Sequence, residues 1–489
     1  MADSAVFSKY ELEREKNIKK NEELLASLNL LQQKRNPVSM LDSSRKKFPK
    51  QSEKQQSKME PLRMKLRSRS SNDEETAVSI SDKLLQYDKN IPERRTGTNE
   101  FVEILGQNIV DAIDVDAVLK RLSDICLAET FPYIPVAPST ERFKELQKYD
   151  IPSDQGFLKV VPHRIYSVTF ANTSKPLALA GDKWGYLGIW SPLEEYQNGI
   201  ALTLQPHVRA ISKIFSHYTL GNQIVTCSYD GTVRILNLSH ALCDTILDRE
   251  EMLFYDISCM DDGNCFLVAS NAGKVLSTDK RDRKSTQSIL LHEKKISCVD
   301  RFPDQHTFCT CSGDHSVCIW DFRKVSFDEQ IRSTPIQALP HNKAVTASRV
   351  SPSGKFILTT CYDNYIRVFQ SPLNNPTKGD NLLHKIPHNN NTGRWVTPFS
   401  AEWDPQSDNL FLCGSMEKPR GIDLFHMGKS LETSRLSQEN LTTIIPRLAV
   451  HPTTEMIIGG SSSGRVFVFA GCKDRISILH QNPKLPTEC

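Results

Sequence analysis

The sequence lacks the patterns that define several large classes of protein. Its 13 cysteines are an odd number with no CxxC pair, and no secretory leader opens the chain. These features predict free, buried thiols in a reducing compartment and not a disulfide framework. No apolar run approaches the ~18 residues of a membrane-spanning helix. We therefore expect a soluble intracellular protein.

Signatures of catalysis and of metal binding are missing as well. There is no serine in a nucleophile elbow, no glycine-rich loop that could cradle phosphate and no paired Cys/His spacing. The histidines and aspartates that recur with the repeats described below fit buried structural pairs better than general acid–base chemistry. We therefore predict a non-enzymatic protein with no catalytic residues, no cofactor and no metal.

Charge is balanced overall but unevenly distributed. The chain has 61 Lys and Arg against 58 Asp and Glu, a formal net charge of +3, so any nucleic-acid signal must come from local clusters. Residues 1–31 predict an amphipathic helical segment, either a partly formed helix in a tail or a docking helix for a partner. Residues 32–100 predict a basic disordered tail, because residues 32–71 contain 12 Lys and Arg against 3 Asp and Glu. Its clusters at Arg45–Lys47 and Lys65–Arg69 suit nuclear import or loose phosphate binding, although a solvated tail explains either one alone.

Between this tail and the main domain, residues 101–150 predict a helical collar. Apolar residues recur at helical spacing in residues 101–127, where Asp114 or Asp116 could begin a helix. Residues 141–149 add a short amphipathic piece. We expect the collar to be structural.

Residues 151–475 repeat a unit of two strands joined by a tight turn. Its clearest copy is Cys311–Arg323 (CSGDHSVCIWDFR), in which a buried strand, a Gly-Asp turn and an alternating strand lead to Trp-Asp. That signature marks the blade of WD-repeat β-propellers, whose copies lie ~40–45 residues apart. Seven copies predict an all-β fold, a single seven-bladed WD-repeat propeller with the third and sixth copies degenerate and residues 476–489 left as a C-terminal tail. The strand pairs are expected at 177–190, 224–236, 266–278, 308–320, 356–369, 410–425 and 456–469, with Phe157–Val161 closing the ring.

Blade geometry places the unusual basic residues on one face. The four strands of a blade are counted here from the channel outward. The connection to the next blade and the turn between the second and third strands then share a face. Lys, Arg or Trp from at least five blades falls in these segments, although any single lysine there also suits a solvated loop. A basic rim of this kind would focus positive potential on an anionic partner such as DNA. The predicted DNA-binding residues are Lys183, Trp184, Arg209, Lys294, Lys295, Lys343, Arg394 and Trp395.

One connection differs from the others. His388–Thr397 (HNNNTGRWVT) places Arg394 and Trp395 after three Asn and a Gly. An arginine beside a large aromatic on such a loop suits base stacking or wedging into a distorted duplex. The alternative is that Trp395 packs into its own blade.

Several stretches resemble the WD-repeat protein 76 family with its fungal relatives and, more distantly, the small subunit of the UV-damaged DNA-binding complex. They are YELEREKNIKKN near the start, HRIYSVTF and AGDKWGYLGIW in the first blade, and PHNNNTGRWVTPFSAEWDP and SSSGRVFVF near the end. The resemblance implies a nuclear, DNA-associated propeller linked to DNA damage responses. It also implies that Gly393–Trp395 form a hairpin tip at the lesion and that Lys294 and Lys295 contact DNA. Because the tip residues differ from those of the damage-binding subunit, the lesion preference is not carried over, and reading of modified cytosine is left open.

A second resemblance concerns Trp320–Arg323. The WD-x-R pattern is similar to the motif by which propellers dock on the adaptor of the cullin-4 ubiquitin ligase. Asp321 and Arg323 are the predicted docking residues, on the face away from the basic rim, although Asp321 alternatively holds its own blade. The expected function is therefore nuclear binding of damaged or modified DNA, with a role as ligase substrate receptor as an extension. The competing hypothesis is a chromatin scaffold that grips acidic peptides or histones.

Overall fold

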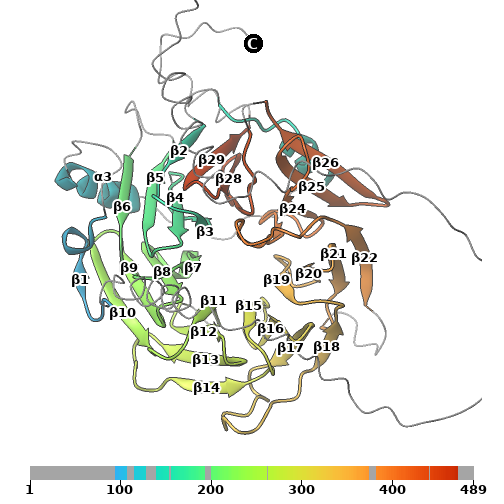
Figure 1. Cartoon of the computed structure of the whole chain (residues 1–489), viewed down its shortest axis with the longest axis horizontal. Helices are drawn as coiled ribbons and strands as arrows, with labels where there is room; N and C mark the ends of the chain where they lie inside the picture. The colour runs from blue at the N-terminus through green and yellow to red at the C-terminus, as the bar shows by residue number, and fades with distance from the viewer. Residues whose placement is uncertain are drawn as a thin grey trace, which may run out of the picture. The chain divides into compact units, whose positions relative to one another are not determined.

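A computed structural model describes residues 94–106, 115–127, 139–152, 156–173, 175–192, 200–260, 263–373, 381–439 and 441–471 of the chain. The predicted amphipathic segment, the two basic clusters and the C-terminal tail lie outside these residues. Within them, antiparallel sheets are arranged around a central axis, with short helices at the periphery (Figure 1).

Seven sheets form the blades of one propeller, which confirms the fold expected from the repeats. Each predicted strand pair is found as the second and third strands of a blade. Blades 1 to 3 contain β3 (Ile165–Phe170), β4 (Ala178–Asp182), β5 (Leu187–Ser191) and β6 (Ile200–Leu204); β7 (Ile211–Phe215), β8 (Gln223–Ser228), β9 (Thr232–Asn237) and β10 (Leu242–Asp248); and β11 (Phe254–Cys259), β12 (Cys265–Ser270), β13 (Lys274–Asp279) and β14 (Gln287–Leu290). Blades 4 and 5 contain β15 (Ile296–Arg301), β16 (Thr307–Ser312), β17 (Ser316–Asp321) and β18 (Gln337–Pro340); and β19 (Val345–Val350), β20 (Phe356–Cys361), β21 (Tyr365–Gln370) and β22 (Leu382–Pro387). Blades 6 and 7 contain β23 (Glu402–Trp403), β24 (Leu410–Gly414), β25 (Gly421–Met427) and β26 (Leu431–Ser437); and β27 (Arg447–Val450), β28 (Met456–Gly460) and β29 (Arg465–Ala470).

The ring closes through a strand from the start of the propeller. β2 (Phe157–Lys159) pairs antiparallel with β29 and places Phe157 opposite Phe467. The closing strand is shorter than the predicted Phe157–Val161, because the amides of Val160 and Val161 both donate to the Gly464 carbonyl and leave the ladder. Closure removes the long open edge that an incomplete last blade would expose.

Residues just before the helices contradict the expected boundary of the tail. β1 (Asn99–Glu100) pairs with β10 and adds a fifth strand to blade 2. The 3-10 helix η2 (Phe101–Ile104) then buries Phe101 and Ile104 in the core of blades 1 and 2. The disordered tail expected over residues 32–100 is therefore wrong at its end, because this apolar anchor holds residues 99–100 on the sheet.

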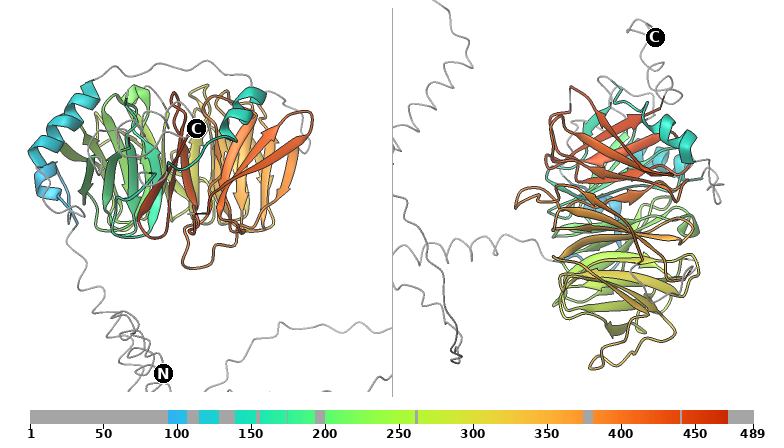
Figure 2. Two further views of the ribbon diagram at one scale, coloured as in Figure 1. Left: turned by 90° about the horizontal axis from the view of Figure 1, so that it is seen from above. Right: turned by 90° about the vertical axis from the view of Figure 1, so that its right-hand side faces the viewer.

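The helices α3 (Val115–Leu127) and α4 (Ser139–Leu146) lie toward the same face of the propeller (Figure 2). The hydroxyl of Ser123 on α3 donates to the Ser239 carbonyl between β9 and β10 at 3.5 Å. Arg142 on α4 donates to Asp404, between β23 and β24, at 3.0 Å. Both contacts are to turns on the face opposite the turns between second and third strands. The helices therefore contact the face away from the predicted basic residues.

The recurrent histidines are buried structural groups, as the sequence indicates. His207 Nδ1 lies 3.1 Å from Asp230 Oδ2. In blade 4, His292 is satisfied on both nitrogens, by Asp314 at 2.8 Å and by the Thr310 hydroxyl at 2.7 Å. Burial alone would raise the pKa of both aspartates, but the histidines and other hydrogen bonds lower it overall. These pairs fix each connection on its own blade.

Three results are limited to the described ranges. No helix there combines the length and apolarity needed to cross a bilayer. No group of three or more His, Cys, Asp or Glu side chains there is arranged to hold a metal ion. The ten cysteines whose side chains the structure describes are free thiols, and most are buried.

Candidate nucleic-acid interface

The connections between blades and the second–third turns meet on one face. In blade 1 the turn packs so tightly on the next connection that a Cβ at Gly185 would lie 2.1 Å from the His207 carbonyl oxygen. Likewise, a Cβ at Gly273 would lie 2.2 Å from the His292 carbonyl oxygen. Both glycines have positive φ angles, +82° and +70°, which favours glycine at each position. We call this surface the basic face and define it by Lys183, Trp184, Arg209, Lys294, Lys295, Lys343, Arg394 and Trp395.

The six cations of the basic face are all exposed to solvent. None of them forms a salt bridge with any residue that the structure describes. Lys183 Nζ lies 5.0 Å from the centre of the Trp184 ring, and Lys295 Nζ lies 4.9 Å from that of Tyr255. Such cation–π contacts orient an ammonium group without neutralising it. The face therefore presents positive charge that has no acidic partner among the described residues.

The connection to blade 3 contributes no predicted residue to the basic face. The connection to blade 3 carries exposed Glu250 and Glu251, and Glu250 lies 3.5 Å from Arg94. These acids separate the basic residues beside blades 1 and 2 from those leading into blades 4, 5 and 6. The charge of the basic face is therefore mixed beside blade 3, where the exposed Arg249 lies next to these two acids.

The loop His388–Thr397 is anchored at both ends. Near its start, the buried Asn390 side chain donates to the Cys361 carbonyl at 2.9 Å. At its end, the Thr397 hydroxyl donates to the Ile165 carbonyl at 2.7 Å. Because Ile165 belongs to blade 1, this bond links the loop, which leads into blade 6, to the blade on the far side of blade 7. The base of the loop is therefore fixed from two sides.

The tip of the same loop is exposed. Gly393 has a φ of +62°, and a Cβ there would meet no atom within 4 Å. Trp395 is 80% exposed, with the Arg394 guanidinium carbon 5.9 Å from the centre of its ring. The alternative that Trp395 packs into its own blade is therefore wrong. In Figure 2 a large loop in the orange part of the chain projects from the face opposite the helices.

Sequence reasoning missed Arg164, which holds the tip of this loop. Its guanidinium donates to the Arg394 carbonyl at 3.0 Å and to the Tyr166 hydroxyl at 2.7 Å. Arg164 occupies the connection to blade 1, the same kind of segment that drew attention to Arg209. The geometric rule alone could therefore have found it.

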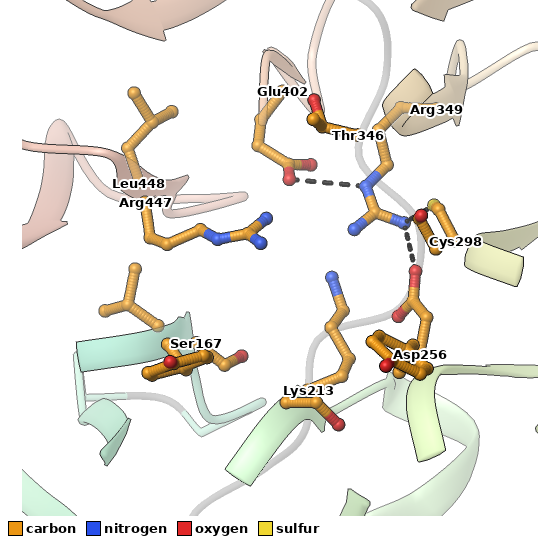
Figure 3. Close-up of a pocket in the computed structure, with 14 residues that line it drawn as sticks. Ser167, Lys213, Asp256, Cys298, Thr346, Arg349, Glu402, Arg447 and Leu448 are labelled. Atoms are coloured by element: carbon orange, nitrogen blue, oxygen red, sulfur yellow. Dashed lines mark hydrogen bonds and ion pairs between the residues drawn. The ribbon is translucent and has the colours of Figure 1, made fainter. Parts of the chain in front are cut away.

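Below the basic face, the channel is filled by buried charged side chains (Figure 3). Arg349 lies between Asp256 at 3.0 Å and Glu402 at 3.3 Å, and Lys213 and Arg447 project into the same space. Burial and the nearby Arg349 charge lower the pKa of Arg447. The remaining cavity has a volume of only about 20 Å³, room for about one water molecule. A macromolecular ligand must therefore bind at the mouth of the channel.

The predicted docking residues lie away from the basic face. Asp321 ends β17, opposite Thr307, whereas β17 begins at the second–third turn on the basic face. The Arg323 side chain is 63% exposed and binds both oxygens of its own Asp321, each at 3.0 Å. Asp321 therefore has a local structural role, and the exposed Arg323 is the residue available to a partner.

The comparisons with known proteins agree with the repeat pattern. The WD domain, G-beta repeat, family model matches residues 200–237, 283–321 and 333–370. These ranges cover the strand pairs of blades 2, 4 and 5 and leave out those of blades 1, 3, 6 and 7.

Similarity extends over nearly the whole chain. WD repeat-containing protein 76 of Xenopus laevis is 31% identical over 94% of this chain and 80% of its own length. The chain belongs to this family. The mouse protein of the same name is 27% identical over 96% of this chain and 75% of its own length. DNA damage-binding protein CMR1 of Scheffersomyces stipitis is 28% identical over 95% of this chain and its whole length. This member of the WD repeat-containing protein 76 family is thus related to fungal proteins named for binding damaged DNA.

Proposed function

We propose that this protein binds damaged or modified duplex DNA through the basic face, with the loop His388–Thr397 at the distorted site. The observation that carries the proposal is the loop itself, which combines a base fixed by Asn390 and Thr397 with an exposed Arg394–Trp395 tip. The names of the CMR1 relatives support the same role. Binding, and not catalysis, is the activity that we assign.

The exposed cations supply the affinity in this proposal. Lys or Arg side chains beside several blades can each approach a phosphate, and each phosphate contact releases condensed counterions. The affinity should therefore fall steeply as salt is raised. Because phosphates are the same in every sequence, these contacts position the duplex and do not select a lesion.

The loop supplies the selectivity. A damaged or mismatched base pair is easier to unstack, so a rigidly held aromatic gains more there than in an intact duplex. Stacking of one base on an aromatic side chain is worth ~1–3 kcal/mol. Trp395 can take this role without a change in the fold, since its ring is already outside the blade.

A double substitution at the tip tests the proposal. Arg394→Ala with Trp395→Ala should lower affinity for a damaged duplex about 10- to 100-fold and leave thermal stability unchanged, because both side chains are exposed. Binding would be measured by fluorescence anisotropy on intact and damaged duplexes at two salt concentrations. Tyr218→Ala is the matched control, an exposed aromatic on the opposite face.

Each result has a distinct meaning. Salt-sensitive binding with a damage preference that disappears in the double variant supports a lesion reader. Binding with no preference in the wild type would contradict the role of the loop and leave a general chromatin binder. No DNA binding at all would overturn the proposal and favour a scaffold for acidic peptides or histones.

Ligase association and nuclear localisation are part of the same proposal. Exposed Arg323 on the opposite face would let the adaptor of the cullin-4 ligase and DNA bind together. The basic clusters Arg45–Lys47 and Lys65–Arg69 would direct nuclear import. Import is tested by microscopy of a tagged full chain with and without charge-neutralising substitutions in the two clusters. The substituted protein should shift to the cytoplasm.

A further inference from the structure

A second group of cations lies where blade 7 meets blade 1 (Figure 1). Lys159 ends the closing strand β2, and Arg465 begins β29 directly opposite it. His163 lies in the connection to blade 1, and Lys183 lies in the second–third turn of that blade. We call these four residues the closing patch. All four are exposed, and only Lys183 is among the residues predicted to bind DNA.

Backbone hydrogen bonds hold the segments of the closing patch together. The amide of Val160 donates to the Gly464 carbonyl at 3.1 Å and joins the ends of β2 and β29. The amide of Lys183 donates to the Arg164 carbonyl at 3.0 Å and joins the turn of blade 1 to the connection that precedes it. These bonds fix the backbone from which the four side chains project, so their charges stay close together.

The charge of the closing patch is not offset by any acid that the structure describes. None of its four side chains forms a salt bridge with a described residue. The adjoining Asp182 is fully buried, and both its oxygens accept from backbone amides, among them that of His163 at 3.2 Å. Burial and the charges of Lys159 and Lys183 lower the pKa of His163, as expected beside positive charge without a counterion.

The pairing of β2 with β29 brings like charges together. Phe157 stabilises this pair, because its ring stacks on Phe467 with the ring centres 5.5 Å apart. Two residues further on, Lys159 stands directly opposite Arg465, and like charges at such positions destabilise a sheet. The Arg465 guanidinium carbon lies 6.0 Å from the centre of the Phe157 ring, a contact that orients the charge without neutralising it. An anion bound between the two cations would remove their repulsion.

The closing patch adjoins the exposed tip of the loop His388–Thr397. Arg164, the residue after His163, donates to the Arg394 carbonyl at 3.0 Å. A duplex whose distorted base pair meets Trp395 therefore brings neighbouring phosphates to the closing patch. Phosphates are the anions that exposed Lys and Arg side chains contact in any DNA sequence.

We propose that Lys159, Lys183 and Arg465 bind phosphates of the DNA strand that leaves the distorted site over blades 7 and 1. The inference rests on the DNA binding proposed above and gives the duplex a direction on the basic face. The connection to blade 3 is unsuited to that path, because its exposed Glu250 and Glu251 repel phosphate.

Arg465→Glu in the full chain tests the proposal. The new carboxylate stands opposite Lys159, so the substitution removes one phosphate contact and neutralises a second without weakening the closing strand. Affinity for an intact duplex should fall about 10-fold, and the salt slope should become shallower by about 2, because each contact contributes ~0.9. Fluorescence anisotropy at several salt concentrations measures both. Lys429→Glu, at an exposed lysine between β25 and β26 on the opposite face, is the matched control and should change neither.

His163 provides a second readout that a merely structural role of the patch would not move. Inorganic tripolyphosphate, added to the full chain without DNA, should raise the pKa of His163, because a bound anion offsets the charges that lower it. The rise is measured by NMR titration of ¹³C-labelled histidine, with His163→Gln to assign the signal. It should be lost in Arg465→Glu and kept in Lys429→Glu.

The two experiments separate this inference from the proposed function. If Arg465→Glu keeps the wild-type salt slope while Lys294→Glu lowers it, the role of the closing patch is overturned and DNA binding stands. If His163 does not respond to tripolyphosphate, the patch binds no phosphate and the inference is likewise overturned. If the wild type binds tripolyphosphate at the patch but binds no duplex, the proposed function fails, and a DNA strand is not the ligand of the patch.

Discussion

Blade 4 and blade 6 are built from the same repeat, yet they differ in the first strand and in the histidine–aspartate pair that holds the preceding connection. In blade 4, β15 has six residues, and His292 is bonded to both Asp314 and Thr310. In blade 6, β23 has only two residues, and His388 contacts Asn390 at 2.7 Å and lies 3.7 Å from Asp423. The histidine–aspartate pair is therefore tight in blade 4, at 2.8 Å, and loose in blade 6, at 3.7 Å.

The comparison separates stability from binding. A buried histidine–aspartate pair with full hydrogen bonding holds its connection in one place and leaves nothing for a ligand. Where that pair is altered, as at His388 and Asp423, the connection is longer and the contact is looser. The regular blades therefore act as the scaffold, and the irregular blade is the place to look for specific recognition.

The largest expected effect is on stability, and it should differ between the two blades. Asp314→Ala leaves His292 Nδ1 without its carboxylate and should cost about 3 kcal/mol of unfolding free energy. Asp423→Ala removes a partner of the more exposed Arg435 and should cost about 1 kcal/mol. Urea denaturation of both variants measures the difference. Equal losses would show that blade 6 uses its aspartate as blade 4 does.

A smaller effect distinguishes the two connections that we propose to face DNA. Lys294→Glu, before blade 4, should weaken binding to every duplex about 10-fold and lower the salt slope by about 1–2, with the damage preference unchanged. The Arg394/Trp395 variant, before blade 6, should change that preference. Lys284→Glu, an exposed lysine on the opposite face, is the control. An unchanged salt slope for Lys294→Glu would mean that this lysine does not contact phosphate.

The sequence predicts most of the fold because the second and third strands are buried on both sides. β16, for example, is buried at every position and contains no charged residue, a pattern typical of a fully buried strand. The outer strands are harder to predict, since β22 alternates between partly buried and exposed positions over most of its length. The two-residue β1 carries no periodic signal at all.

The candidate site is predictable in part for a similar reason. Its connections follow from repeat geometry, which places Arg209 and Lys294 on one face without any knowledge of contacts. The bond from Arg164 to the Arg394 carbonyl and the loose contact of His388 with Asp423 could not be foreseen. The first depends on a contact between residues of different blades, and the second on the exact distance between a histidine and its neighbours. Spacing along the chain encodes neither.

The smallest expected effect on stability belongs to Arg323, and the matching residue for comparison lies in the neighbouring blade 3. Arg281 in blade 3 binds its own Asp279 at 3.1 and 2.6 Å, the same arrangement as Arg323 and Asp321 but without the tryptophan. Arg323→Ala and Arg281→Ala should each change stability by less than about 0.5 kcal/mol, because both guanidinium groups are exposed. Only Arg323→Ala should abolish co-purification of the ligase adaptor, and neither should alter DNA binding.

Loss of the adaptor in both variants would assign docking to the shared Asp-x-Arg geometry of blades 3 and 4 and not to the Trp-Asp motif. Retention in both would contradict docking at this face. Loss of DNA binding in Arg323→Ala with the adaptor retained would mean that the two faces have exchanged roles. Because the hydrogen bonds of Arg323 that the structure describes are to Asp321 of its own turn, none of these outcomes can be attributed to unfolding of the blade.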